Sequence, residues 1–248
     1  MKSTSRVFSF KKVMAELPRG EPVSTADLLA RGVSNFRASA LARSGWLTHP
    51  ARGVYMLPGD TLTREGALAF LARQIPGLHI GGKTALAWRG VRQNLAFRET
   101  ISLWGDKPGK LPAWFTKSFA ARYQATRLFD AKMPKGYGLQ PLPTGRQDLL
   151  VSVPERALLE LLSDLGKSQG WSEARELVQG LPNLREPVLN KLLAHVTRIK
   201  VVRAAATFAR DMQLPWAKVA LKHSNRLGGG KRWVAVSKSG ERLDLTRP

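Results

Sequence analysis

The chain has 248 residues, 43% of them hydrophobic, so it is long enough to bury a core and we expect two domains. It has no cysteine, which excludes disulfides and thiolate metal sites, and no apolar run long enough to span a membrane. Forty Lys and Arg against 18 Asp and Glu give a net charge of +22, which favours polyanionic partners such as nucleic acid; the alternative is a generally basic protein whose charge serves solubility.

The N-terminal residues predict a helix over Val7–Leu17, because their apolar side chains fall on one stripe. Lys11 and Lys12 then point away from that stripe, where they could contact phosphates. The basic residues 1–6 are not followed by an apolar segment, so we expect no signal peptide and a cytoplasmic protein.

Residues 24–57 predict a winged helix-turn-helix. Ser24 or Thr25 can cap a short helix that ends at Gly32. Ser34 caps a second helix, which ends at Gly45. The apolar runs on either side of residues 49–53 can pair as a β-hairpin wing.

The second of these helices is the expected recognition helix in the major groove of duplex DNA. If Ala38, Leu41 and Ala42 pack inward, the opposite face is free to contact bases. Arg52 on the wing would reach a phosphate or the minor groove. The alternative is a winged fold used for protein contact, with these residues as solvated charges. The candidate DNA-binding residues are Asn35, Phe36, Arg37, Ser39, Arg43 and Arg52, with Lys11 and Lys12.

Proline and glycine in Leu57–Asp60 predict a domain boundary, so we expect a winged domain over residues 1–59 and a larger mixed α/β domain over 60–248. The predicted fold class is therefore α+β. Helices are expected over residues 61–74, 83–89, 154–163, 171–180, 185–195 and 198–212. Strands are expected over 78–80, 100–104, 122–129 and 149–153, and residues 216–221 and 233–245 are expected to be strand-rich.

Residues Gly77–Thr84 match the phosphate-loop pattern letter for letter. A true phosphate loop follows a buried strand, whereas Gly77 follows a helix and a proline. A short strand, a turn and a helix explain the same letters. A nucleotide-binding enzyme that uses Lys83 therefore stays as the lesser alternative.

Candidate catalytic residues are few. The four histidines have no metal-ligand spacing, and Glu155, Glu160 and Asp164 fit the polar face of a helix whose leucines face the core. We therefore expect no metal, no cofactor and no enzymatic activity. A basic cluster near the C-terminus is either a second nucleic-acid or partner surface or simply a mobile loop; it consists of Lys222, Arg226, Lys231 and Arg232.

Taken in order, several of these segments resemble the AbiEi antitoxin family of bacterial type IV toxin–antitoxin systems. The resemblance rests on Leu-Leu-Ala-Arg-Gly-Val-Ser (28–34), Leu-Ala-Arg-Ser-Gly-Trp-Leu (41–47) and Gly-Val-Tyr-Met-Leu-Pro-Gly (53–59). It continues through the segment 79–91 and through Pro-Glu-Arg-Ala in the segment 153–162, and is weaker over the last fifty residues.

The resemblance implies a two-domain regulator with a role in phage defence. Its winged domain would repress its own operon by binding inverted repeats in the promoter. Its C-terminal domain would neutralise a neighbouring nucleotidyltransferase toxin, without a stable complex between the two proteins. A further alternative is an RNA-binding module that shields the toxin's substrate.

Overall fold

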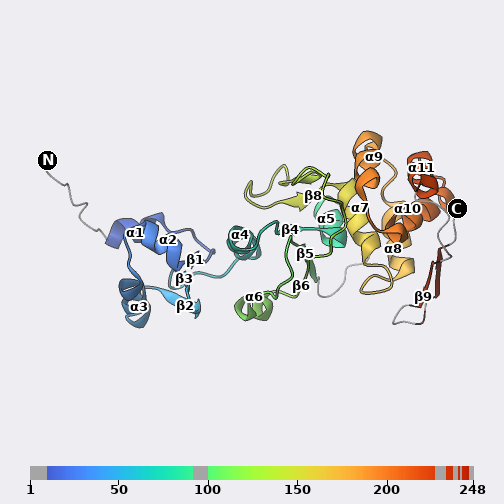
Figure 1. Cartoon of the computed structure of the whole chain (residues 1–248). Helices are drawn as coiled ribbons and strands as arrows, with labels where there is room; N and C mark the ends of the chain where they lie inside the picture. The colour runs from blue at the N-terminus through green and yellow to red at the C-terminus, as the bar shows by residue number, and fades with distance from the viewer. Residues whose placement is uncertain (1–9, 92–99, 227–232, 237–239, 241, 246–248) are drawn as a thin grey trace, which may run out of the picture. The chain divides into compact units, whose positions relative to one another are not determined.

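The computed structural model describes residues 10–91, 100–226, 233–236, 240 and 242–245, and the chain forms two compact units (Figure 1). The first unit comprises Met1–Gln74 with Pro112–Phe119, and the second comprises Ile75–Leu111 with Ala120–Pro248. Both units combine helices with strands, so the predicted α+β class is confirmed.

A small antiparallel sheet and a set of short helices make up the first unit. The strands have the order β1-β3-β2, so β3, the last of the three in the sequence, lies in the middle. The elements are α1 Phe10–Glu16, β1 Val23–Ser24, α2 Thr25–Ala30, α3 Asn35–Arg43, β2 Thr48–Ala51, β3 Val54–Met56, α4 Arg64–Gln74 and α6 Ala113–Ser118.

The core of the winged part of this unit draws on every helix and on the wing. Val33 and Ala38 are fully buried, and Leu41 and Ala42 pack against the same cluster, as the sequence predicts. Burial of these side chains fixes the rotation of α3 about its axis and therefore which residues it exposes. The buried residues are Val13, Leu17, Val23, Leu28, Val33, Ala38, Leu47, Tyr55 and Leu57.

Residues beyond the wing stay attached to the first unit. The Asp60 carboxylate accepts hydrogen bonds from the Gly20 amide and Arg19, each at 2.9 Å, and the Thr63 amide donates to the Gly20 carbonyl. Helix α6, which the sequence analysis did not anticipate, belongs here too, with Trp114 packed edge-on against Phe70 at 5.6 Å. The predicted domain boundary after residue 59 therefore stays a prediction.

The second unit is built on a mixed sheet of five short strands with the order β6-β5-β4-β8-β7. The pairs β4–β8 and β5–β6 are parallel, and β4–β5 and β7–β8 are antiparallel. The strands are β4 His79–Ile80, β5 Ile101–Trp104, β6 Ala121–Gln124, β7 Leu139–Gln140 and β8 Val151–Ser152. Of the predicted strand over residues 122–129, the structure forms strand β6, which ends at Gln124. Further along, Phe129 forms an isolated β-bridge with Val196.

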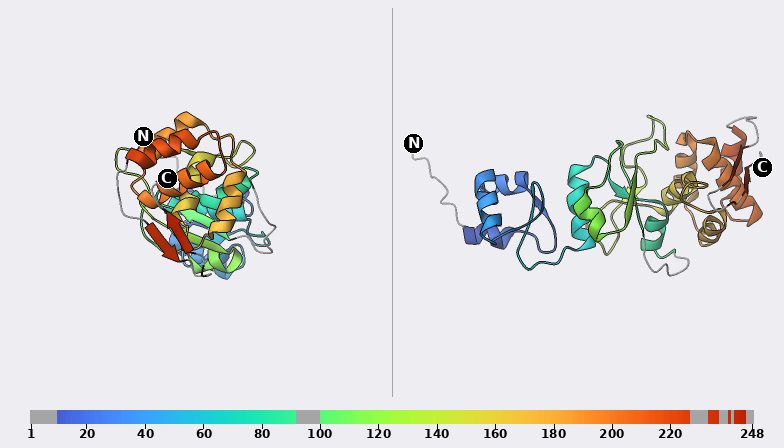
Figure 2. Two further views of the ribbon diagram at one scale, coloured as in Figure 1. Left: turned by 90° about the vertical axis from the view of Figure 1, so that its right-hand side faces the viewer. Right: turned by 90° about the horizontal axis from the view of Figure 1, so that it is seen from below.

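Helix α7 is the centre of the second unit and contacts α5, α8, α9 and α10. Helices α8 to α11 gather at one end of this unit (Figure 2). The helices are α5 Gly82–Trp88, α7 Pro154–Ser163, α8 Trp171–Gln179, α9 Glu186–His195, α10 Ile199–Asp211 and α11 Ala217–Arg226. An antiparallel hairpin of β9 Trp233–Val236 and β10 Arg242–Leu245 follows.

The prediction of strand over residues 216–221 is wrong, because Ala217–Arg226 is helix α11. Trp216, Ala220 and His223 are all buried, at the three- and four-residue spacing of a helix face rather than the two-residue spacing of a strand. The Trp216 indole also donates a hydrogen bond to the Leu181 carbonyl at 2.8 Å. The apolar residues of this short segment fit the spacing of a helix and that of a strand, and contacts with residues distant in the sequence favour the helix.

The polar residues of α7 do not face solvent, although their alternation with leucines made a polar face plausible. Glu155 and Glu160 are 1% and 0% exposed, and Asp164, just after the helix, is 6% exposed. Each carboxylate has an arginine partner: Arg185 for Glu155 at 2.9 Å, Arg122 for Asp164 at 2.6 Å and, one turn along α7 itself, Arg156 for Glu160 at 2.8 Å. The helix is therefore enclosed on both its apolar and its polar sides.

Glu160 accepts four hydrogen bonds at the centre of this unit. Its Oε1 is 3.0 Å from Nε2 of His79 and 2.8 Å from Nε of Arg156, and its Oε2 accepts from the Gly82 amide at 3.0 Å and the Ser152 hydroxyl at 2.8 Å. A buried carboxylate is tolerated only when its lone pairs are satisfied in this way. Burial by itself would raise the pKa of Glu160, but the charge of His79, its hydrogen bond and Arg156 together outweigh it and lower this pKa to about 2.

We predict that Glu160→Gln lowers the free energy of unfolding by about 3–5 kcal/mol, because it leaves buried cationic donors without their anion. The pKa of Glu160 is lowered in the folded state, so its stabilising effect is present above about pH 4.5 and is lost as the pH falls towards 2. Urea unfolding measured from pH 7 to pH 2.5 should therefore show the gap between wild type and variant narrowing with acid.

Glu176→Gln is the matched control, since Glu176 lies exposed on α8 of the same unit. It should change stability by less than about 0.5 kcal/mol at every pH. Equal stability of wild type and Glu160→Gln at neutral pH would refute the structural role assigned to Glu160.

Candidate nucleic-acid interface

The two helices of the turn are held by local caps. Ser24 and Asp27 form a reciprocal capping box, in which the Asp27 amide donates to the Ser24 hydroxyl at 3.1 Å and the Ser24 amide to the Asp27 carboxylate at 2.7 Å. Ser34 caps α3 by accepting from the Arg37 amide at 3.4 Å. The turn between the helices includes Gly32 at φ +81°, a conformation that favours glycine.

Helix α3 exposes the face opposite its buried residues. Asn35, Phe36, Arg37, Ser39 and Arg43 are all exposed, and Phe36 is exposed to 77%. Helical spacing places Phe36, Ser39 and Arg43 along one line of that face. The structure therefore brings the five predicted α3 residues onto the outer surface of one helix.

The wing is the hairpin of β2 and β3, and its turn is Arg52–Gly53, with Gly53 at φ +75°. The Thr25 amide donates to the Gly53 carbonyl at 3.1 Å, which ties the turn to the start of α2. Arg52 is exposed at the tip of this anchored hairpin. The wing thus presents one cation from a fixed backbone.

Two arginines of these elements, Arg43 on α3 and Arg52 on the wing, are not neutralised by ion pairs within the described residues. An unpaired exposed arginine keeps all its donors for an incoming ligand, and its planar fork suits guanine edges and phosphates. The surface formed by α3 and the wing therefore presents two arginines that are not paired within the described part of the chain.

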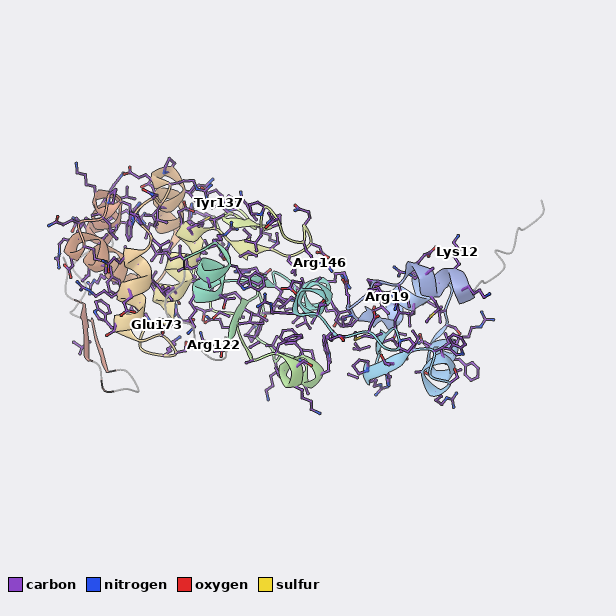
Figure 3. All side chains as sticks on the ribbon, turned by 180° about the vertical axis from the view of Figure 1, so that it is seen from behind. Lys12, Arg19, Arg122, Tyr137, Arg146 and Glu173 are labelled. Atoms are coloured by element: carbon purple, nitrogen blue, oxygen red, sulfur yellow. The ribbon has the colours of Figure 1, made fainter. Side chains whose placement is uncertain are left out.

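Lys11 and Lys12 are exposed, as predicted, and belong to α1, a different helix from α3. Lys12 lies 4.0 Å from Glu16, one turn along the same helix. Figure 3 places Lys12 on the side of the first unit away from α3. Of the candidate residues, the structure therefore groups those of α3, with Arg52 on the adjoining wing, and separates the two lysines.

The residues of the phosphate-loop pattern serve the sheet of the second unit. The Gly82 amide, which a phosphate would use, already donates to the Glu160 carboxylate. The Thr84 hydroxyl, which would hold magnesium, is buried and accepts a hydrogen bond from the Ser102 amide at 2.9 Å. Lys83 pairs with Glu173 at 3.2 Å. This geometry gives no support to a phosphate held by the loop backbone.

Gly81 lies so close to the side chains of Glu160 and Trp104 that only glycine fits at this position. A Cβ on Gly81 would lie 2.3 Å from Oε2 of Glu160 and 2.6 Å from a carbon of Trp104. Any larger residue would push the carboxylate out of its network. Gly81 lies between Gly77 and Gly82, the two glycines that the phosphate-loop pattern requires, and close packing against the Glu160 network explains why this position is glycine.

Half of the predicted second basic surface lies on α11, where Lys222 and Arg226 are exposed one turn apart. Arg226 donates to the Ala194 carbonyl at 2.9 Å, at the end of α9. Lys231 and Arg232 lie outside the described residues. The exposed Lys218 extends the line by one further turn, which the sequence analysis did not include because it expected a strand there.

The histidines serve structural contacts in this fold. His79 is bonded to Glu160, His195 lies 2.9 Å from Asp130, His223 lies 2.8 Å from Asn190, and the His49 ring stacks on Tyr55. Within the described part of the chain no group of three or more His, Asp or Glu side chains is placed to hold a metal ion. Nor is any described helix long and apolar enough to cross a membrane.

Comparison with known protein families matches both parts of the chain. Residues 7–97 match the family described as "Transcriptional regulator, AbiEi antitoxin N-terminal domain". Residues 98–247 match the one described as "Transcriptional regulator, AbiEi antitoxin, Type IV TA system". The resemblance predicted from the sequence is thereby confirmed.

Among solved structures, the crystal structure of the RV2827C protein from Mycobacterium tuberculosis is similar to this chain, with a TM-score of 0.59 and 17% identity. The match covers 89% of this chain and 80% of the other. At this identity the likeness concerns the fold alone. Comparison with curated proteins gives no match.

We predict that Ser34→Ala lowers the stability of α3 by about 1 kcal/mol, because it removes the side-chain acceptor at the helix start. Hydrogen exchange of the α3 amides should quicken accordingly. Ser39→Ala, an exposed substitution inside the same helix, is the control and should leave exchange unchanged or slower, since alanine is the better helix former. The same acceleration in both variants would contradict the capping role.

Proposed function

The chain belongs to the AbiEi family of antitoxins and transcriptional regulators of type IV toxin–antitoxin systems, and we propose that its winged module represses its own operon by sequence-specific binding to the promoter. The observation that carries this proposal is the outer face of α3, where Asn35, Arg37 and Arg43 are exposed while the opposite face is buried. Helix and wing geometry of this kind suits a major groove with a flanking contact.

Each residue has a proposed role in that complex. Arg37 and Arg43 suit guanine edges, and Asn35 suits adenine, because their side chains can form paired hydrogen bonds there. Phe36 and Ser39 would contact thymine methyls or phosphates, and Arg52 the backbone or the minor groove beside the wing. Lys11 and Lys12, on α1, would contact phosphates only if the duplex extends or bends to that side.

Repression through inverted repeats requires two copies of the module. Two recognition helices on a duplex bind half-sites about 34–36 Å apart, or a multiple of that spacing. We therefore propose that two chains occupy one operator. The length of the spacer in the promoter would follow from the distance between the two α3 helices in that complex.

We further propose that the second unit provides the antitoxin activity against a nucleotidyltransferase toxin in the cytoplasm, without a stable complex and without catalysis by this chain. The family assignment of residues 98–247 supports the antitoxin part. The buried Glu155, Glu160 and Asp164 support a non-catalytic second unit, because each is taken up by arginine, amide or hydroxyl partners rather than left for a substrate.

A second candidate function is RNA binding by the second unit, which would shield the toxin's substrate. It is favoured by Lys218, Lys222 and Arg226, which are exposed at four-residue intervals along α11. This spacing of cations suits a polyanionic backbone more than a neutral partner. Preference for structured RNA over the operator duplex would favour this function.

The first experiment compares binding to the chain's own upstream promoter with binding to a scrambled duplex of equal length, across a salt series. We expect a preference of about a thousandfold or more that persists at physiological salt. Fluorescence anisotropy measures both affinities directly. Equal affinities that fall together with rising salt would reduce the interaction to charge and would reject the repressor proposal.

We predict that Arg43→Ala and Arg37→Ala each weaken promoter binding by about 1–3 kcal/mol per lost base contact and reduce the preference over scrambled duplex. Arg52→Ala should weaken binding to both duplexes alike, since it loses a backbone contact. Lys110→Ala, an exposed lysine of the second unit, removes the same charge and should change neither affinity by more than about twofold. An equal loss in Lys110→Ala would contradict the assignment to α3.

A further inference from the structure

A polar cavity of about 230 Å³ lies in the second unit, beside the end of α7. It is smaller than the roughly 300–1,000 Å³ of sites for drug-sized ligands, so it suits a small group. Its walls come from α5, β5, β6, α7 and the loop that follows α7. The lining residues are Lys83, Thr100, Ser102, Arg122, Leu161, Asp164, Ser168 and Gln169.

Two cations, Lys83 and Arg122, line this cavity, and each is only partly engaged. Lys83 bonds to Glu173 at 3.2 Å, which uses one of its three donors. Arg122 donates to Asp164 through Nη2 at 2.6 Å, which leaves the rest of its guanidinium fork available. Figure 3 shows Arg122 and Glu173, the partner of Lys83, at the same edge of the second unit.

Hydroxyl groups add further donors to the cavity. Ser102 is only 6% exposed, and its hydroxyl has no hydrogen-bond partner among the described residues. The Ser102 Oγ is open to the cavity, where water or a ligand can satisfy it. Thr100 and Ser168 line the same space with exposed side chains. The cavity therefore holds more donors than the protein itself uses.

The surroundings of the cavity are positively charged. Asp164 interacts with Arg122, Lys167 and Lys200. With Lys83, these positive side chains outnumber the two carboxylates, Asp164 and Glu173. Burial first, and then the charges of Lys167 and Arg198, lower the pKa of Lys200 to about 8. The excess of positive charge around the cavity favours an anion inside it.

We propose that this cavity binds the phosphate group of a small phosphate monoester, held by Lys83, Arg122 and the Ser102 hydroxyl. Lysine and arginine together with a hydroxyl supply charge and donors from several directions, which matches the three terminal oxygens of a phosphate better than the two of a carboxylate. The size of the cavity admits the phosphate and leaves the organic part towards the open side.

This site differs from the one that the phosphate-loop pattern would imply. There the backbone amides of the loop and the hydroxyl of Thr84 hold the phosphate and a magnesium ion. Here Gly82 and Thr84 keep their bonds within the protein, and only the side chain of Lys83 faces the ligand. The proposal includes binding only and no chemical step.

The test is calorimetric titration of the full chain with ribose 5-phosphate, with inorganic phosphate and with ribose. We expect both phosphates to bind and ribose to give no signal. Lys83→Ala and Ser102→Ala should each weaken ribose 5-phosphate binding by about tenfold, as expected for a lost hydrogen bond to a charged group. Arg122→Lys keeps the charge opposite Asp164 but loses the fork, and should also weaken binding.

Lys110→Ala is again the control and should change the affinity by less than about twofold. No binding of either phosphate to the wild-type chain would overturn the proposal, and so would an equal loss in Lys83→Ala and Lys110→Ala, which indicates general attraction to a basic protein. Lys83 is only half-buried and its side chain is 39% exposed, so its variant should fold whatever happens to Ser102→Ala. Promoter binding by Lys83→Ala should stay unchanged, which separates this site from the proposed repressor function.

Discussion

The fully buried carboxylate of Glu160 is the interaction on which the second unit depends. It joins four elements at one point, because its donors come from β4, α5, β8 and α7 itself. An ionised group in this place is stable only while all four donors remain, so the positions of these elements are fixed together. Gly81 lies so close to the carboxylate that the backbone turn into α5 is fixed as well.

The same network explains a sequence pattern that otherwise suggests a nucleotide site. The amide of Gly82 and the hydroxyl of Thr84 have the spacing that a phosphate loop requires, yet a glutamate from α7 takes the place of the phosphate. A protein carboxylate and a bound phosphate satisfy a helix start in the same physical way. The sequence pattern alone cannot distinguish a phosphate loop from a loop that binds a protein carboxylate, because Glu160 lies 78 residues away from Gly82 in the sequence.

The elements that could be predicted from the sequence are those fixed by interactions between residues close together in the chain. Caps at Ser24 and Ser34 and the positive-φ glycines at Gly32 and Gly45 depend on neighbours within a few residues, and the winged module was predicted from them. Helix α11 and the short α6 were missed, because their form depends on contacts such as Trp216 with Leu181 and Trp114 with Phe70. The buried state of Glu155, Glu160 and Asp164 was missed for the same reason: their partners come from distant elements.

Charge is used in two different ways in the two units. In the second unit, carboxylates buried within α7 or at its end pair with arginines, so these charges are shielded from salt by the protein around them. On α3 and the wing, Arg43 and Arg52 are exposed and have no ion-pair partner in the described part of the chain, so their attraction for a polyanion is screened as salt rises. Salt should therefore weaken DNA binding well before it weakens the second unit. This difference allows binding and folding to be measured separately in one intact chain.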